Sequence, residues 1–334
     1  MENKNYVLVT GGTGFIGAHQ CNEFVNNGYN VVAFSRSGNS INKEFNENVK
    51  KGLITVISGD VQNFDFDSLN YQFDYIIHIA GKVSVYGELK DFMKINYDGT
   101  KRLLEYAKKH NVKCFTYFSS TAVYGYYGFK NITEDADKKP FKNPYSISKL
   151  KTENLVKDYC KENSMDYVII RPGNVYGEYD YTSSHEIFTR IKKGKMLICA
   201  KGKYESCVVY VKNLTNAVFI ATTLDTAHNT DYNVTDGNRE TLNQIFTLIA
   251  NTFNVKPKFK NFPAFMSKII ATIVEGTYYT LHIKKAPLIT KFSVYQNCND
   301  YSFSIDKIKG VGYNPLYSMA QGIKNTCDWI NSLT

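Results

Sequence analysis

The sequence predicts an α/β protein built on a doubly wound parallel sheet, followed by a smaller, mostly helical substrate domain. Three observations lead to this fold class. Short β-branched runs alternate with longer helical patterns through the first half of the 334 residues. Most of these runs are almost continuously apolar, which is typical of parallel strands covered on both faces. A glycine-rich turn directly follows the first run. Alternation of this kind builds sheets with right-handed crossovers.

The individual elements follow from this rhythm. We expect strands at residues 6–10, 30–35, 53–58, 75–79, 114–119 and 167–171, because each is a short apolar run bounded by polar residues or glycine. Longer stretches with helical periodicity separate them, for example 16–27, 92–110 and 145–163.

The rhythm changes after Arg171, where helices lengthen and strands shorten. We therefore expect a dinucleotide-binding domain over residues 1–172 and a substrate-binding domain over 173–334. The two are predicted to interleave, since a further strand at 232–234 indicates that segments near 208–236 return to the first sheet.

Composition excludes several classes of protein. The chain is 43% hydrophobic and 21% charged, so it can bury a core. No run reaches the roughly 18 apolar residues of a membrane span, and the first residues, MENKNYVLVT, do not resemble a secretory signal. The net charge of +9 fits a lysine-rich solvated surface, and we expect no nucleic-acid partner.

The cysteines and histidines indicate no metal site. The seven cysteines are odd in number and form no C-x-x-C pair, and the six histidines form no H-E-x-x-H motif. We expect a reduced, cytoplasmic protein without a disulfide framework.

The segment T-G-G-T-G-F-I-G at 10–17 lies between the first strand and the first helix. In such a turn one glycine permits the sharp bend, a second lets backbone amides approach a pyrophosphate, and a third lets helix and strand pack closely. The helix N-terminus adds free N–H groups and partial positive charge. This predicts a Rossmann-type dinucleotide site whose cofactor-binding residues include Gly11, Thr13, Gly14, Phe15, Ile16 and Gly17.

The end of the second strand bears on the choice of cofactor. An acid that binds the ribose 2′-hydroxyl is usual there, but this sequence has Phe34-Ser35-Arg36-Ser37. A guanidinium matches a phosphate, so Arg36 favours NADP(H), with NAD(H) also allowed. After the third strand, Asp60 and Val61 are candidates for the adenine site, although Asp60 could equally cap the next element.

A candidate catalytic triad follows in chain order. Tyr145 and Lys149 are four residues apart at the start of a predicted helix, so they share one face. A neighbouring ammonium favours the phenolate and should lower the pKa of the tyrosine. Ser120 follows the fifth strand, at the sheet edge where such folds bind ligands. Ser120 can then hold a substrate oxygen while Tyr145 transfers its proton.

These residues resemble the extended short-chain dehydrogenases/reductases, the NAD(P)-dependent epimerase/dehydratase superfamily, over essentially the whole chain. The similarity is carried by the motifs at 10–17, 59–61, 78–81, 96–100, 119–125, 145–149, 171–177, 209–214 and 232–237. The resemblance implies that Ser120, Tyr145 and Lys149 form the triad, with Lys149 also holding the nicotinamide ribose. It places Ala80, Gly81, Lys82, Pro172 and Gly173 against the cofactor, and it implies a homodimer through the helices at 92–110 and 145–163.

Three local features separate the branches of this family. Dehydratases carry an Asp-Glu pair after the strand-end hydroxyl residue, whereas Thr121 and Ala122 follow Ser120 here. Nucleotide-sugar members place an arginine, which clamps the diphosphate, where this chain has Ser206, and a second one in the region of 296–301, which contains none. Third, the segment 262–283 is apolar and, with 284–290, looks like that of 3β-hydroxysteroid dehydrogenase-like members.

The sequence therefore favours an oxidoreductase that interconverts a hydroxyl and a keto group on a mostly apolar, sterol-like, polyketide-like or acyl substrate. A nucleotide-sugar 4-epimerase or 4-reductase and a non-catalytic cofactor-sensing module are the alternatives. The apolar helix at 262–285 closes the small domain or, as the sharper hypothesis, touches a membrane surface together with Lys284 and Lys285. Candidate substrate contacts lie in the predicted pocket loops and are Ser84, Thr121, Tyr124, Asn174, Tyr176 and Tyr210.

Overall fold

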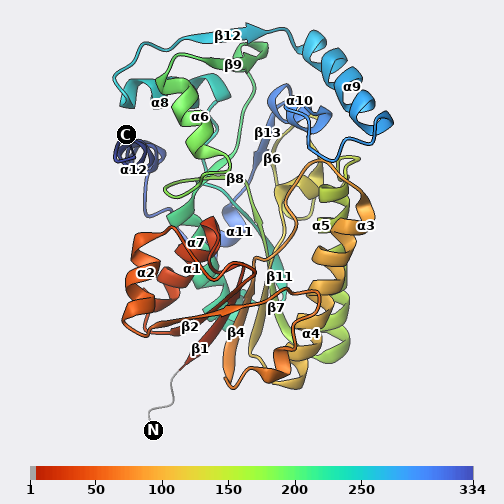
Figure 1. The fold of residues 1–334 in the computed structure, drawn as a ribbon, viewed down its shortest axis with the longest axis vertical. Helices are drawn as coiled ribbons and strands as arrows, with labels where there is room; N and C mark the ends of the chain where they lie inside the picture. The colour runs from red at the N-terminus through yellow and green to blue at the C-terminus, as the bar shows by residue number, and fades with distance from the viewer. Residues whose placement is uncertain (1–4, 334) are drawn as a thin grey trace.

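The computed structural model describes residues 5–333 and contains a seven-stranded parallel sheet, which occupies the lower half of the molecule in Figure 1. The strand order is β11-β7-β5-β4-β1-β2-β3, and the direction of the order reverses between β4 and β1. This confirms the predicted doubly wound sheet. Its strands are β1 Tyr6–Thr10, β2 Asn30–Ser35, β3 Ile54–Ser58, β4 Phe73–His78, β5 Cys114–Phe118, β7 Asp166–Pro172 and β11 Thr230–Val234.

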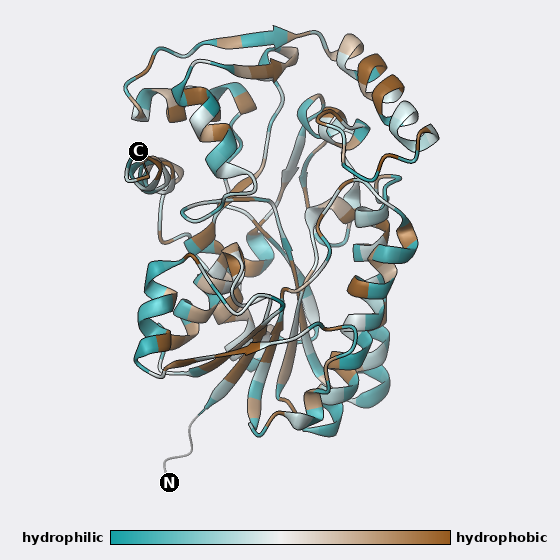
Figure 2. Ribbon diagram, viewed as in Figure 1, coloured by the Kyte–Doolittle hydropathy of each residue, from teal (hydrophilic) through white to brown (hydrophobic). Residues whose placement is uncertain are grey.

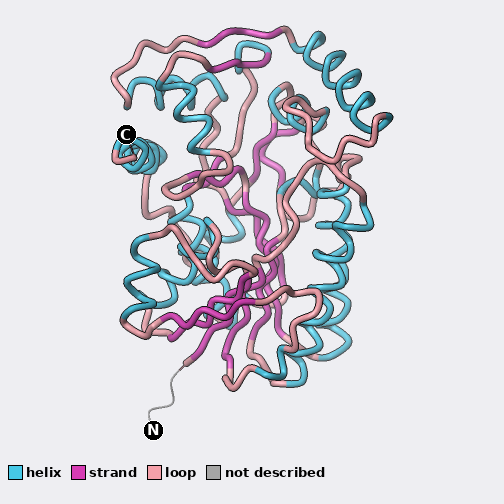
Figure 3. Tube along the Cα trace, viewed as in Figure 1, coloured by secondary structure: helices cyan, strands magenta, loops and turns pink. Residues whose placement is uncertain are grey.

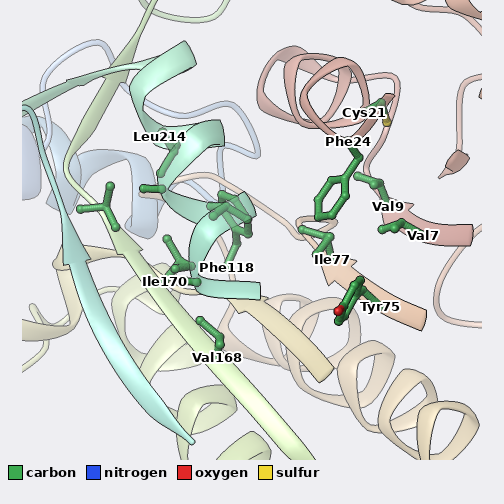
Figure 4. Close-up of a cluster of buried hydrophobic side chains, with 14 of the residues drawn as sticks. Val7, Val9, Cys21, Phe24, Tyr75, Ile77, Phe118, Val168, Ile170 and Leu214 are labelled. Carbon is green, nitrogen blue, oxygen red and sulfur yellow. The ribbon is translucent and has the colours of Figure 1, made fainter. Parts of the chain in front are cut away.

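Helices cover both faces of this sheet (Figure 3). Side chains alternate across a strand, so Val7 and Val9 pack under α1, whereas Leu8 packs toward α4 and α5. Figure 4 shows part of the hydrophobic cluster on the α1 side of the sheet, in which Phe24 of α1 and Leu214 of α7 pack against the strands. The helices are α1 Phe15–Asn26, α2 Lys43–Lys50, α7 Val211–Thr223 and α11 Asp306–Lys309 on one face, and α4 Gly99–Lys109 and α5 Pro144–Asn163 on the other.

The predicted helix at 92–110 is interrupted by a π-helical segment. The short helix α3 (Leu89–Phe92) leads into the π-helical turn η2 (Met93–Asp98), and α4 follows. Such turns are frequent at functional sites. Here the turn contains the buried Asn96.

A second layer lies above the carboxyl ends of the strands and is built mainly from α6, α8, α9, α10 and α12 (Figure 1). Buried hydrophobic residues of α6, α8 and α12 form one cluster in this layer, and Figure 2 shows further hydrophobic residues along α9. These helices are α6 Ser184–Lys192, α8 Leu242–Thr252, α9 Ala264–Thr280, α10 Lys291–Asn297 and α12 Met319–Asn331.

Three further two-stranded parallel sheets are present, namely β10-β8, β12-β9 and β13-β6, of which β12-β9 lies at the far end of the second layer (Figure 1). Their strands are β6 Phe129–Ile132, β8 Asn174–Tyr176, β9 Met196–Cys199, β10 Val208–Tyr210, β12 Phe259–Phe262 and β13 Tyr301–Phe303. The chain returns to the central sheet at β11, as predicted, and the division of the chain near residue 172 stays a prediction.

One covalent bond differs from the expectation of a fully reduced chain. Cys199, at the end of β9, forms a disulfide with Cys298, directly after α10, although 99 residues separate them. The small-domain fold brings their Cα atoms within 6.3 Å, and sequence spacing alone cannot reveal such a pairing. The other five cysteines are free and buried.

Among the residues described, the helices are all too short or too polar to cross a bilayer.

Candidate active site

The site is built where β1, β4 and β5 end. Strand β4 lies between β1 and β5 in the sheet, so the loops after these three strands are neighbours. Thr10 ends β1 and His78 ends β4, with Thr10 Oγ1 and His78 Nδ1 2.7 Å apart. His78 Nε2 lies 2.9 Å from Thr100 Oγ1, and burial lowers the pKa of the imidazole to about 3. A neutral histidine therefore ties the strand ends to α4.

The glycine loop fits a dinucleotide phosphate. Gly11 has a φ of +71°, and a Cβ there would lie 3.1 Å from the Ala80 amide nitrogen. A Cβ on Gly17 would overlap the Gly11 carbonyl. Helix α1 begins after Gly14 with no side-chain cap and no acid in its first turn, so its N–H groups remain available to an anion. Phe15 and Ile16 form the first turn of this helix.

The residues predicted to bind the adenosine end of the cofactor lie beyond β2 and β3. Thr13 Oγ1 donates to the Ser37 carbonyl at 3.0 Å, which holds the loop after β2 against the glycine loop. Arg36 is exposed beside Ser37. Asp60 accepts hydrogen bonds from the Gln62 backbone N–H at 2.9 Å and from its side chain, so here it caps a turn. Val61 is buried in the core.

The loop after β4 approaches the candidate triad. Asn96 accepts from the Lys82 backbone N–H at 2.6 Å and donates to Ser148 Oγ at 2.9 Å. A Cβ on Gly81 would lie 3.1 Å from Asn96 Oδ1 and 3.7 Å from Lys149 Nζ. The π-helical turn thus positions Asn96 between the loop that carries Ala80 and Gly81 and the helix that carries Lys149.

Tyr145 and Lys149 project from the first two turns of α5. Asn143 caps this helix by accepting from the Ser146 N–H at 2.7 Å, and Pro144 begins it. Lys149 Nζ donates to the Phe118 carbonyl at 2.6 Å and lies 6.0 Å from the centre of the Tyr145 ring. Ser120, which caps the short 3-10 helix η3 (Thr121–Tyr124), hydrogen-bonds with Tyr145. The structure therefore brings Ser120, Tyr145 and Lys149 together.

The electrostatics of this group differ in one respect from the sequence-based expectation. Burial lowers the pKa of Lys149 to about 8. The pKa of Tyr145 is raised rather than lowered, because burial outweighs its hydrogen bond with Ser120. The expectation that the neighbouring ammonium lowers the pKa of Tyr145 is therefore wrong. The physical reason is that Nζ bonds to the Phe118 carbonyl and not to the phenol.

A buried charge network lies directly behind the triad and was not predicted. Glu153 lies one helical turn beyond Lys149. Its carboxylate accepts hydrogen bonds from Arg171 Nε at 2.9 Å and from Arg171 Nη2 at 2.8 Å, and a third from the Ser119 hydroxyl. Arg171 also donates to the Tyr124 hydroxyl at 2.7 Å and pairs with Asp231. The signal in the sequence is the glutamate four residues after Lys149, since i, i+4 spacing continues the same helix face.

The predicted substrate contacts divide into two groups. Tyr124, Tyr176 and Tyr210 are buried, and their hydroxyls bond to Asn233, Asp236 and Glu178. Tyr176 and Tyr210 belong to the hydrophobic cluster of the second layer, whereas Tyr124 belongs to the cluster against which Tyr145 packs. Thr121 donates to the Pro172 carbonyl at 3.1 Å. Ser84 donates to the Tyr86 carbonyl at 2.9 Å.

Asn174 belongs to a neutral polar cluster that the sequence did not reveal. Its amide donates to the Tyr301 hydroxyl at 2.6 Å, and its carbonyl oxygen accepts from Gln296 at 2.8 Å. Ser206 Oγ lies 2.8 Å from the same tyrosine hydroxyl. The two segments that lack the expected phosphate-clamping arginines therefore meet at one place. Gly173, just before Asn174, donates its N–H to the Val234 carbonyl at 3.0 Å.

A parallel sheet with a glycine loop after its first strand, and Ser, Tyr and Lys gathered at its carboxyl edge, defines a dehydrogenase/reductase of the short-chain type. The model of the NAD dependent epimerase/dehydratase family matches residues 7–235. The chain belongs to this family, and it is an enzyme of the extended short-chain type.

Full-length relatives are similar at low identity. The chain is 24% identical to a putative UDP-glucose 4-epimerase of Methanocaldococcus jannaschii, covering 98% of each chain. It is 23% identical to a 2-alkyl-3-oxoalkanoate reductase of Shewanella oneidensis, over 96% of this chain and 85% of that one.

Solved structures share the fold. A UDP-N-acetylglucosamine 4-epimerase from Methanobrevibacter ruminantium, in complex with UDP-N-acetylmuramic acid, superposes with a TM-score of 0.80 at 23% identity, covering 100% of both chains. A UDP-glucuronic acid 4-epimerase from Bacillus cereus, in complex with NAD, gives 0.78 at 20% identity, covering 98% of this chain and 99% of that one. At this identity the likeness establishes the fold alone.

Proposed function

We propose that this enzyme transfers hydride at a secondary hydroxyl or keto carbon of a nucleotide sugar, as a 4-epimerase or 4-reductase. The observation that carries the proposal is the meeting of Ser120, Tyr145 and Lys149 beside the glycine loop. The name of the full-length methanogen relative supports a nucleotide-sugar substrate over the hydroxysteroid-like one that the apolar helix suggested.

The three side chains divide the chemistry. A bound nicotinamide dinucleotide supplies the hydride acceptor or donor. Ser120 holds the reacting oxygen of the substrate, and Tyr145 gives or takes its proton. Lys149 provides a positive charge on the same helix face, close enough to Gly81 to meet a cofactor ribose there. The same arrangement serves oxidation and reduction. In oxidation the substrate loses a hydride and a proton, and in reduction both transfers run in reverse.

A dehydratase reaction fits less well. Expelling water from a sugar needs a general acid and a general base in addition to the tyrosine. Thr121 and Ala122 follow Ser120, and the Thr121 hydroxyl is bonded to the Pro172 carbonyl. No carboxylate stands at these positions.

A second candidate is reduction of a keto group on an apolar substrate. The cluster of Ser206, Asn174, Tyr301 and Gln296 is neutral and favours this candidate, since diphosphates are usually gripped by arginine. Thermal stabilisation separates the two. UDP, UDP-glucose or dTDP-glucose should raise the melting temperature of the cofactor-loaded enzyme, whereas β-keto acyl compounds and sterols should not. Stabilisation by the keto compounds alone would support the second candidate.

Turnover tests the triad itself. We expect Tyr145→Phe to lower kcat by about 10²–10⁴-fold, the usual contribution of a general acid or base, while the dissociation constant of the dinucleotide changes by less than about threefold. The matched control is Tyr71→Phe, which alters a partly buried tyrosine just before β4, at the amino ends of the strands and away from the candidate site. If neither natural nor analogue substrates turn over although dinucleotide binds tightly, a cofactor-sensing module is the better description.

We further propose that the site accepts NADP(H) as well as NAD(H), with NADP(H) preferred. The support is Arg36 with Ser37 and Ser35, in place of an acid after β2. Calorimetry with both dinucleotides tests this: Arg36→Ala should weaken NADP⁺ at least about tenfold and leave NAD⁺ unchanged. Arg102→Ala, which alters an arginine on α4 bonded to the Phe64 carbonyl, is the control. Tighter NAD⁺ binding by the wild type would contradict the preference.

The assembly we propose is a homodimer through α4 and α5, in the cytoplasm. Around a hollow of about 610 Å³, the turn η2 before α4 carries Met93 and Tyr97, and α5 carries Leu155 and Tyr159. Light scattering after size exclusion measures the mass, and Leu155→Asp should yield monomers. Fractionation of cells under non-reducing conditions tests the compartment and the state of Cys199.

A further inference from the structure

Helix α9 is built with its small residues inward and its large apolar residues outward. Ser267 and Ala271, four residues apart, are the buried positions of this helix. Phe265, Ile269 and Ile273 occupy the opposite face and are 66%, 55% and 63% exposed. A surface helix normally does the reverse. This inverted pattern makes α9 a helix with an apolar face that nothing in the described chain covers.

The exposed apolar surface extends past both ends of α9. Phe262 precedes the helix, Met266 lies in its first turn, and Leu281 and Leu288 follow it. Leu288 is 95% exposed. We call this surface the α9 face, and it consists of Phe262, Phe265, Met266, Ile269, Ile273, Leu281 and Leu288. Figure 2 shows the brown bands along α9, on an outer corner of the second layer far from the N-terminus.

Positive charge surrounds the α9 face. Residues 256–291 contain seven lysines and one acid. Lys256, Lys258 and Lys260 precede the helix and are exposed, as are Lys284 and Lys285 after it. Across residues 5–333 the structure shows no ion pair to any of the seven. The single acid, Glu275, accepts a backbone hydrogen bond from Lys291 at 2.7 Å.

We infer that the α9 face docks on an anionic phospholipid bilayer, with α9 lying in the plane of the interface. An interfacial helix needs large apolar residues on one face and lysines or arginines that reach the headgroups. The α9 face supplies the apolar residues and the surrounding segment 256–291 supplies the lysines. Helix α9 itself, at 17 residues, is not a membrane-spanning helix. A second copy of this chain is a poor occupant, because two such segments, each with seven lysines and one acid, repel each other.

The C-terminal end of α9 contacts the loop after β4. The Tyr86 hydroxyl donates to the Ile283 carbonyl at 3.0 Å, and its ring lies 4.7 Å from that of Tyr279. Tyr86 follows the Ala80–Lys82 segment of the candidate site by only a few residues. A bilayer that holds α9 would therefore lie next to the segment 82–88, on the substrate side of the protein.

Co-sedimentation with vesicles tests the inference. The full chain should bind vesicles of phosphatidylcholine with about one-third phosphatidylglycerol at low salt, and binding should weaken at high salt, since the attraction is screened. Ile269→Glu/Ile273→Glu should lower the partition coefficient at least tenfold. Leu316→Glu, which charges another highly exposed leucine, should leave it unchanged.

The charge requirement has its own matched pair of variants. Each lysine near an anionic surface contributes about 1 kcal/mol, or about fivefold in affinity. Lys284→Glu/Lys285→Glu should therefore weaken binding at least tenfold. Lys50→Glu/Lys51→Glu, an adjacent pair at the end of α2, should not.

A fluorescence probe reports insertion rather than mere adsorption. The emission of Phe265→Trp should shift to the blue with anionic vesicles, whereas that of Leu316→Trp should not. The inference is overturned if the wild type ignores anionic vesicles at low salt, or if both glutamate pairs bind as the wild type does. It is also overturned if Ile269→Glu/Ile273→Glu changes the mass of the protein in solution instead, because a second copy or a protein partner would then cover the α9 face.

Discussion

Removal of Glu153 is the sharpest test of how this fold holds its active site. The carboxylate is fully buried, and it accepts two hydrogen bonds from the Arg171 guanidinium and one from Ser119. Glu153→Ala deletes all three and leaves a buried guanidinium with Tyr124 and Asp231 as its remaining partners.

The expected loss follows from these contacts. Hydrogen bonds to charged groups contribute about 1.5–3 kcal/mol each, and breaking one side of a buried pair costs about 3–5 kcal/mol. Asp231 retains part of the compensation, so we expect the free energy of unfolding to fall by about 3–5 kcal/mol. This is a large share of the roughly 5–15 kcal/mol that stabilises a typical domain.

Urea unfolding followed by circular dichroism measures the effect. Glu162→Ala, an exposed position on the same helix, should change stability by less than about 0.5 kcal/mol. Glu153→Leu combined with Arg171→Met should recover most of the loss, because it removes both charges. A loss below about 1 kcal/mol for Glu153→Ala, or a double variant less stable than either single variant, would refute the reasoning.

Three further predictions follow from the same elements. His78 takes up its proton only near pH 3 when folded but near pH 6.5 when unfolded, so its burial destabilises the fold increasingly below pH 6.5. Relative to His78→Asn, the wild type should therefore lose about 2 kcal/mol between pH 7 and pH 5 in urea titrations, and parallel curves would contradict this. Because the pKa of Lys149 is about 8 and Glu153 raises it against burial, kcat/KM should decline above about pH 8. Glu153→Gln should move that decline to lower pH; a profile unchanged up to pH 10 would exclude a charged lysine from the reaction. Finally, Gly17→Ala should abolish dinucleotide binding in calorimetry, because its Cβ overlaps the loop backbone. Gly276→Ala, with open space around its Cβ, should leave it intact.

Much of the fold could be predicted because the signals are local. The strand at 6–10 matches β1 and the strand at 30–35 matches β2, while the other sheet strands shift by one or two residues at their ends. Apolar runs identify buried strands wherever both faces are covered. The same locality placed Tyr145 and Lys149 on one face of α5, since helix geometry determines which residues are neighbours.

The substrate side could not be predicted to the same depth. Tyr124, Tyr176 and Tyr210 were expected in a pocket, but they are buried and hydrogen-bonded in the interior. Whether a tyrosine lines a cavity or fills a core depends on what packs against it. Ser206 and Gln296 are 90 positions apart in the chain, and only the pairing of β8 with β10 and the position of β13 bring them into one cluster. There Ser206 contacts the Tyr301 hydroxyl and Gln296 donates to the side-chain oxygen of Asn174.

The sequence by itself determined the doubly wound sheet, the phosphate loop and the chain order of the candidate triad, because these rest on local apolar periodicity and on motifs that follow one another along the chain. Tertiary structure alone decided the Glu153–Arg171 pair, the Cys199–Cys298 disulfide and the outward-facing apolar side of α9. These depend on contacts between distant segments and on which side of a helix the rest of the chain covers. Local periodicity shows that α9 has two faces, but only the packed molecule shows that the small residues are the buried ones.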